Sequence, residues 1–125
     1  MEFTKSLKKN YEFRRVYARG KSASTARIFL YCRKNGKRGN RFGLTVSNKI
    51  GKAVQRNRIR RRLREIYRLN EGKMDRGYDI ILVARHRSRD AEFQQLWADF
   101  LMLSKKMGIL KEKNEESINR SCSIL

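Results

Sequence analysis

The chain has 125 residues, of which 32 are Lys or Arg and 12 are Asp or Glu, so its net charge is +20. This length suits one compact domain with a modest core. Cys32 and Cys122 are far apart, and neither a C-x-x-C pair nor clustered histidine indicates a metal site. No stretch has the roughly 18 apolar residues of a membrane span, and the first residues lack a signal peptide's apolar segment, so a cytoplasmic protein with reduced thiols is expected.

The positive charge is concentrated in the first half of the chain. Residues 1–64 contain 21 basic and 2 acidic residues, whereas residues 65–125 contain 11 basic and 10 acidic residues. The densest part, Lys52–Arg64, has no acidic residue. Like charges packed so closely repel one another unless a polyanion neutralises them. The distribution therefore predicts one strongly positive face that binds nucleic acid.

A short helix is predicted near the start of the chain. Asn10 is a suitable N-cap for the segment Tyr11–Arg19, and Gly20 is a suitable residue to follow its end. The apolar residues of this segment recur at helical spacing and share one face, which carries Phe13, Val16 and Tyr17.

Two strands are predicted next, and they are expected to pair antiparallel. Arg27–Arg33 is rich in aromatic and aliphatic residues, and Arg41–Ser47 follows it after a loop with two glycines. The first strand alternates between two faces, one with Ile28, Leu30 and Cys32 and the other with Phe29, Tyr31 and Arg33. The second set could be core or an open aromatic face, and spacing alone favours neither. Thr45–Lys49 could form a further short strand.

The segment Ala53–Asn70 predicts an amphipathic helix whose polar side is built from arginine. Its apolar stripe contains Ile59, Leu63, Ile66 and Tyr67. A second stripe carries Asn57, Arg60, Arg61, Arg64 and Arg68, with Arg58 and Arg62 on another side. Solvated helices usually interleave Glu with Lys, but this helix has Glu65 alone. Because arginine binds phosphate bidentately and stacks on bases, contact with RNA or DNA is the favoured interpretation.

The second half of the chain predicts a buried strand and a closing helix. Tyr78–Arg85 is a continuous apolar run, typical of a central strand that is buried on both faces. A helix begins near Asp90 as a possible cap and ends at Gly108, with an apolar face of Phe93, Leu96, Trp97, Phe100, Leu103 and Met107. Lys111–Leu125 lacks periodicity and predicts a frayed or disordered tail. We therefore expect one α+β sandwich domain over residues 1–110, of order α-β-β-(β)-α-β-α, and a tail over residues 111–125.

The sequence lacks the side-chain groupings that enzymes and metal sites need. His86 is the only histidine, and Asp75, Asp79 and Asp90 are dispersed among basic neighbours. We expect neither a catalytic residue nor a metal ligand in this chain. A structural ribosomal protein and a DNA-binding transcription factor are the alternative functions. The second is disfavoured because no helix-turn-helix pair or zipper accompanies the arginine-rich helix.

Several strings of residues resemble the protein subunit of bacterial ribonuclease P. Asn48–Glu65 is similar to the family's "RNR" signature, and further similar strings are Phe13–Tyr17, the aromatic residues up to Tyr31, Arg41–Ser47 and Asp79–Arg85. The resemblance covers about Ser6–Leu110 and implies a ribonucleoprotein that removes the 5′ leader of precursor tRNA by phosphodiester hydrolysis. It also implies catalysis by an RNA subunit that binds most of the Mg²⁺, and a left-handed βαβ crossover that contains the arginine-rich helix.

The resemblance implies two groups of RNA-binding residues and two RNA partners. The first group lines a cleft for the single-stranded 5′ leader: Phe13, Tyr17, Phe29, Tyr31, Thr45, Arg56, Asn57, Arg60 and Arg64. The second group contacts the catalytic RNA subunit: Lys49, Lys52, Arg58, Arg61 and Arg62. Tyr17 stands where the family often has Phe, a change that retains stacking. Neither DNA nor a membrane is an implied partner.

Overall fold

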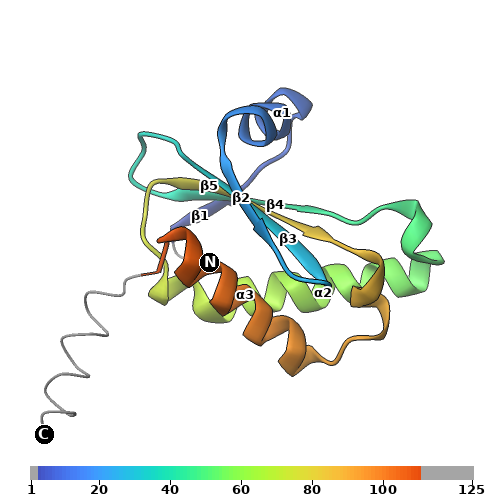
Figure 1. Ribbon diagram of the computed structural model, residues 1–125. Helices are drawn as coiled ribbons and strands as arrows, with labels where there is room; N and C mark the ends of the chain where they lie inside the picture. Colours follow the sequence, from blue (N-terminus) through green and yellow to red (C-terminus); the bar gives the residue numbers. More distant parts are fainter. Residues whose placement is uncertain (1–2, 111–125) are drawn as a thin grey trace, which may run out of the picture.

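The computed structural model describes residues 3–110 as a five-stranded sheet with helices on both faces (Figure 1). The strands are β1 (Thr4–Ser6), β2 (Lys21–Ser24), β3 (Ile28–Lys34), β4 (Asn40–Thr45) and β5 (Tyr78–Ala84). The helices are α1 (Asn10–Arg19), α2 (Ala53–Asn70) and α3 (Phe93–Met107), with 3-10 helices η1 (Asn48–Ile50), η2 (Glu71–Lys73) and η3 (His86–Asp90). Helix α1 lies on one face of the sheet, and α2 and α3 lie on the other. The predicted α+β sandwich is confirmed, while the predicted tail, residues 111–125, lies outside the described residues.

The strand order is β1-β4-β5-β3-β2, with β5 in the centre as predicted. The predicted antiparallel pairing of β3 with β4 is wrong, because β5 lies between them, antiparallel to β3 and parallel to β4. Five of the seven β5 residues are fully buried or nearly so, and a strand this apolar is best placed where neighbours cover both of its edges and both of its faces. Helix α2 therefore connects two parallel neighbours, β4 and β5, as the expected βαβ crossover. Its left-handedness stays a prediction.

The two edge strands, β1 and β2, were not predicted from the sequence. Lys21–Ser24 contains Lys, Ser and Ala and pairs only with β3, so it has no apolar face for periodicity to reveal. Thr4–Ser6 is three residues long and pairs parallel to β4. The further strand considered at Thr45–Lys49 is wrong beyond the first residue, because the chain turns into η1 there. The Ser47 hydroxyl accepts a hydrogen bond from the backbone N–H of Lys49 at 3.1 Å and stabilises this turn.

The three helices were predicted well, although two of their caps were not. Helix α2 has the predicted bounds, and its predicted apolar stripe is fully buried. Lys9, not Asn10, precedes α1, and its backbone N–H donates to Glu12 Oε1 at 3.1 Å. Glu92, not Asp90, precedes α3, because residues 86–90 form η3. Gly108 ends α3 with φ of 76°, the left-handed conformation that glycine adopts without strain.

Two clusters of buried side chains hold the layers together. The larger cluster fills the space between the sheet and α2 and α3, where Tyr67 and Phe100 are its largest fully buried side chains. A much smaller cluster under α1 consists of Leu7, Val16 and Ile81. Helix α1 therefore covers only part of its face of the sheet. No helix among residues 3–110 has the length and apolar character needed to cross a membrane.

The side chains of β3 alternate between these two environments as predicted. Ile28, Leu30 and Cys32 are buried in the larger cluster, whereas Phe29, Tyr31 and Arg33 are only half-buried on the α1 face. Burial raises the pKa of the Cys32 thiol to about 11, so this cysteine behaves as a small core residue in its thiol form.

Candidate nucleic-acid interface

Rows of side chains cross the sheet on its α1 face. The strand register aligns Phe29, Val83 and Thr45 in one row, Tyr31, Ile81 and Gly43 in the next, and Arg33, Asp79 and Arg41 in the third. Helix α1 lies over the middle row, where a Cβ atom at Gly43 would be 2.7 Å from the ring of Phe13. Glycine at this position therefore lets α1 approach the sheet closely. All three residues of the first row remain partly exposed and form a floor beside α1. Of the three, Thr45 lines a hollow there.

Aromatic rings form a continuous chain from α1 onto this floor. The ring centroids of Phe13 and Tyr17 are 6.4 Å apart, Tyr17 meets Tyr31 edge-on at 4.8 Å, and Tyr31 lies 6.1 Å from Phe29. The hydroxyl groups of Tyr17 and Thr45 are hydrogen-bonded at 3.0 Å, which ties the helix to the floor. Tyr17 is nevertheless 38% exposed. The aromatic face that the sequence left undecided is therefore neither closed core nor loose surface, but a fixed and accessible set of rings.

Two arginines of α2 form the opposite wall of this region. One hollow of about 550 Å³ is bounded by Phe13, Tyr17, Thr45 and Arg60, among others. A second hollow of about 380 Å³ shares Phe13 and Arg60 with the first and adds Arg64. The two hollows form one groove between α1 and α2, which we call the α1 cleft. The structure thus brings together most of the residues predicted for the leader.

Four of the predicted cleft residues lie outside these hollows: Phe29, Tyr31, Arg56 and Asn57. Tyr31 adjoins the cleft through its ring contact with Tyr17, and Phe29 lies beyond Tyr31. Arg56 donates through Nη1 to the carbonyl oxygen of Gly51 at 3.3 Å, so its side chain folds back onto the loop before α2. Asn57 is exposed, and its Oδ1 accepts a hydrogen bond from Arg60 Nη1 at 3.1 Å. Asn57 therefore acts on the cleft by orienting Arg60.

A largely buried ion network ties the first turn of α1 to the sheet. Arg41 donates bidentately to Asp79, with Nη2 at 2.7 Å from Oδ2, and also pairs with Glu12 of α1. Burial alone would raise the pKa of Asp79, but hydrogen bonds from Arg41 and Asn35 outweigh it and lower that pKa. The pKa of Glu12 is lowered by the backbone N–H of Lys9 and by the Arg41 charge. One guanidinium therefore joins α1 to the central strand.

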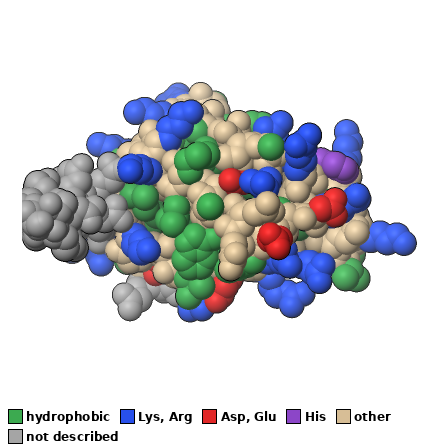
Figure 2. Space-filling model, turned by 60° about the horizontal axis from the view of Figure 1, so that its bottom comes forward, with side chains coloured by type: hydrophobic (Ala, Val, Ile, Leu, Met, Phe, Trp, Pro, Cys, Tyr) green, Lys and Arg blue, Asp and Glu red, His purple; other side chains and the backbone are tan. Residues whose placement is uncertain are grey.

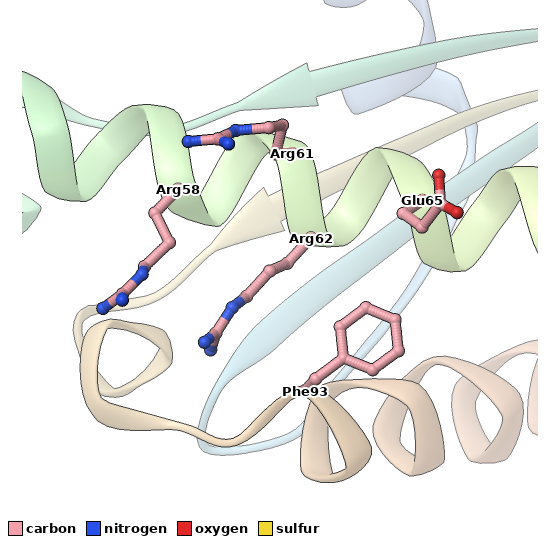
Figure 3. A pocket seen from close by; sticks show the side chains of 5 residues that line it. All are labelled: Arg58, Arg61, Arg62, Glu65 and Phe93. Atoms are coloured by element: carbon pink, nitrogen blue, oxygen red, sulfur yellow. The ribbon is translucent and has the colours of Figure 1, made fainter.

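The residues predicted to contact a second RNA lie on other sides of α2 and on the loop before it. Lys49 and Lys52 are exposed on and just after η1. Arg58, Arg61 and Arg62 line a groove of about 500 Å³ between α2 and α3, together with Glu65 and Phe93 (Figure 3). In the view of this side, Lys and Arg side chains lie mainly around the rim, and the middle holds hydrophobic side chains together with several acidic ones (Figure 2).

These arginines have few partners within the protein. Within residues 3–110, the arginines of α2 form one ion pair, which joins Arg68 to Glu65. Arg62 has a structural contact as well, because its Nη1 donates to the carbonyl oxygen of Ala91 at 2.8 Å and holds the loop before α3. Neither Arg58 nor Arg61 has a side-chain hydrogen bond or ion pair with any other described residue. Their charges are left for an external anion.

A model of one protein family, described as Ribonuclease P, matches residues 1–108. The chain belongs to the ribonuclease P protein family. It is 44% identical over 107 residues to the ribonuclease P protein component of Natranaerobius thermophilus, covering 86% of this chain and 93% of that one. The corresponding protein of Clostridium botulinum is 46% identical over 104 residues, covering 82% and 94%.

Solved structures of ribonuclease P proteins share the fold. That from Staphylococcus aureus superposes with a TM-score of 0.78 at 30% identity and covers 85% of this chain and 97% of its own. That from Thermotoga maritima gives a TM-score of 0.74 at 30% identity and covers 81% and 96%. Family membership supports the role of ribonuclease P subunit and gives no support to the ribosomal alternative.

The structure of this ribonuclease P protein adds two residues that the sequence did not indicate, one beside the Phe29 ring and one in the α1 cleft. The guanidinium of Arg85 lies over the ring of Phe29, 4.6 Å from its centroid, and Nη1 donates to the carbonyl oxygen of Thr25 at 2.8 Å. Arg14 lines the α1 cleft from the helix. Arg85 shares the odd-numbered alternation of Ile81 and Val83. It is already the last residue of the predicted strand, so applying the alternation to that strand would have placed Arg85 on this face.

The described residues of this ribonuclease P protein offer no dedicated metal site. Residues 3–110 contain no group of three or more His, Cys, Asp or Glu side chains that could hold a metal ion. The carboxylates of Glu12 and Asp79, which lie under the start of α1, are both engaged by Arg41. Their oxygens are therefore committed to a guanidinium, and a magnesium site built on them does not fit this arrangement.

Proposed function

We propose that this protein is the subunit of ribonuclease P that binds the single-stranded 5′ leader of precursor tRNA in the α1 cleft and the catalytic RNA subunit through the remaining faces of α2. The observation that supports the first part is the partly exposed row of Phe29, Val83 and Thr45, bordered by aromatic rings of α1 and by Arg60 and Arg64. Aromatic rings beside basic side chains are the usual platform for unpaired bases.

The α1 cleft suits a leader of varied sequence. Stacking uses the face of a base, which all four bases have, and arginine contacts to phosphate are equally independent of sequence. The Tyr17–Thr45 hydrogen bond and the Arg41 network hold the rings in position before RNA arrives, so little conformational entropy is lost on binding. Mature tRNA lacks the leader and would leave the cleft empty, which gives preference for precursor over product.

Catalysis in this proposal belongs to the RNA subunit. Mg²⁺ bound mainly by that RNA would supply the activated water for phosphodiester hydrolysis. The side chains of this protein bind and orient the leader and neutralise phosphates that would otherwise repel one another as the two RNAs meet. A cytoplasmic location follows from this role, since both RNA partners would be found there.

Reconstitution with a bacterial ribonuclease P RNA tests the proposal. At low Mg²⁺, cleavage of precursor tRNA should be much faster with protein and RNA together than with RNA alone, and the protein alone should cut nothing. The double variant Arg60→Gln/Arg64→Gln should lose much of the preference for precursor over mature tRNA. A matched control, Lys105→Gln/Lys106→Gln, removes the same charge from exposed residues of α3 and should keep that preference. Cleavage by protein without RNA, or no gain on reconstitution, would overturn the proposal.

A further inference from the structure

The groove between α2 and α3 combines arginine with an aromatic ring, on the side of the sheet opposite α1. Its volume of about 500 Å³ is within the range of roughly 300–1,000 Å³ typical of small-ligand pockets. Arg58 and Arg62 reach from α2 toward the start of α3, and Phe93 projects from α3 into the same space (Figure 3). The groove therefore has a cationic wall and an aromatic wall that face each other.

Both walls are held in place by the protein. The Arg62 guanidinium is fixed by its hydrogen bond of 2.8 Å to the carbonyl oxygen of Ala91. Phe93 packs partly against the main core, and its ring lies 5.8 Å from that of Trp97. Phe93 is also the first residue of α3. The first turn of this helix is stabilised by a hydrogen bond of 2.9 Å from the Glu92 N–H to Gln95 Oε1. The half-buried Phe93 ring is thus a rigid platform and not a mobile surface side chain.

The charge of the groove selects the kind of occupant. Arg58 and Arg61 have no acidic partner among residues 3–110, and the carboxylate of Glu65, which also lines the groove, is engaged by Arg68. A phosphate fits these arginines, and an arginine-lined groove repels a basic partner. An aromatic wall beside phosphate-binding arginines fits a nucleotide whose base is unpaired, since a base inside a duplex cannot offer its face.

We propose that the α2–α3 groove holds an unpaired nucleotide of the RNA subunit, with its base stacked on Phe93 and its phosphate bound by Arg58 and Arg61. This inference rests on the proposed function and adds a base-stacking contact to a surface otherwise expected to bind phosphates alone. It also makes the two faces of the sheet alike in chemistry, with aromatic rings and arginines on each, for two different single-stranded segments.

Substitution of Phe93 separates stacking from charge. Phe93→Leu should weaken binding of the protein to the RNA subunit about five- to hundredfold, the loss expected when a base–aromatic stack is removed. The slope of log affinity against log salt should not change, because no phosphate contact is lost. Phe93→Tyr keeps the ring and should bind within about twofold of the wild type. Arg61→Gln should lower the salt slope by about 0.9 while the ring remains.

Urea denaturation of each variant shows whether Phe93→Leu is folded at the assay temperature. If it unfolds, a photo-crosslinking phenylalanine analogue at position 93 of the full-length chain replaces it, and this should crosslink to an unpaired nucleotide of the RNA subunit in the holoenzyme. Wild-type affinity of a folded Phe93→Leu, a crosslink confined to the precursor leader, or no crosslink to RNA would each overturn this inference and leave the proposed function intact. Failure of the wild-type protein to bind the RNA subunit would overturn both.

Discussion

Arg41 is predicted to be the side chain whose loss damages the α1 cleft most, through stability. Its guanidinium joins Asp79, whose side chain is 1% exposed, to Glu12 of α1, whose side chain is 13% exposed. Arg41→Met keeps most of the side-chain volume but leaves Asp79 buried with only Asn35 as a donor. Breaking a buried ion pair from one side costs about 3–5 kcal/mol. Since small domains have free energies of unfolding of about 5–15 kcal/mol, this is a large share of the total.

Urea denaturation at pH 7 measures this loss, and a second variant shows its cause. Arg41→Met/Asp79→Asn removes the uncompensated charge as well, so it should be more stable than Arg41→Met alone. A cost below about 1 kcal/mol for Arg41→Met, the value of an exposed pair, would refute the reasoning. The reasoning would also be refuted if the loss of stability in the double variant equalled the sum of the losses in Arg41→Met and Asp79→Asn measured separately. Such additivity would mean that the two charges are not coupled.

The pH dependence of stability gives an independent check of the same network. The pKa of Glu12 is lowered by the Lys9 N–H and by Arg41, and that of Asp79 is lowered by Arg41 against the effect of burial. Carboxylates with lowered folded-state pKa values add stability above their unfolded values, about 4, and lose it as the pH falls through the folded values. The wild-type free energy of unfolding should therefore fall steeply below about pH 4. In Arg41→Met this acid-side loss should be smaller.

Three further predictions concern the two proposed RNA surfaces and the packing of α1 on the sheet. Phe29→Leu should weaken binding of precursor tRNA by about 1–3 kcal/mol in a holoenzyme binding assay and leave mature tRNA binding unchanged, and equal losses for both would contradict the cleft. Arg61→Gln should leave the free energy of unfolding within about 0.5 kcal/mol of the wild type. Arg62→Gln should lower it by about 1–2 kcal/mol, because the hydrogen bond of Arg62 to the loop before α3 is lost. Equal stabilities of the two variants in thermal denaturation would contradict this difference. Gly43→Ala should cost about 1–3 kcal/mol, because the added Cβ would lie 2.7 Å from the Phe13 ring, and a neutral result would show that α1 can shift away.

Periodicity predicted the elements that bury an apolar face. The stripe of Ile59 and Leu63 repeats at helical spacing over several turns, and the strand Tyr78–Ala84 is apolar along most of its length, so both signals are local. Pairing is not local in this way. The loop after β3 contains glycines and looks like a hairpin, but β5, more than thirty residues later, enters between β3 and β4. The order of the strands in the sheet depends on which strand buries the most apolar surface in the central position, and this requires comparing all the strands.

The candidate site also has some features that the local sequence indicates and others that depend on distant segments. The charge run predicted that Arg60 belongs to a nucleic-acid-binding surface. Strand alternation placed Phe29 on the face opposite Ile28 but left open whether that face is core or exposed, and the leader role of Phe29 came from the family resemblance. These signals could not show that Asn57 supports Arg60, that Arg62 also holds the loop before α3, or that Phe93 faces the arginines. Each of these depends on where a distant segment packs, and the apolar pattern of α3 made Phe93 look like an ordinary core residue.

The position of α2 explains how one helix can serve two RNA surfaces. Residues two apart on an α-helix point about 160° away from each other, since each residue turns the chain by about 100°. Arg60 and Arg64 therefore face the α1 cleft, while Arg58 and Arg62 face α3, with the buried stripe of α2 between the two sets. As the connection between the parallel neighbours β4 and β5, α2 packs on the sheet by this stripe alone and keeps both flanks accessible. Under the proposed function, the concentration of arginine in one segment follows from a single helix that borders two grooves, because each groove would bind phosphates with its own cations.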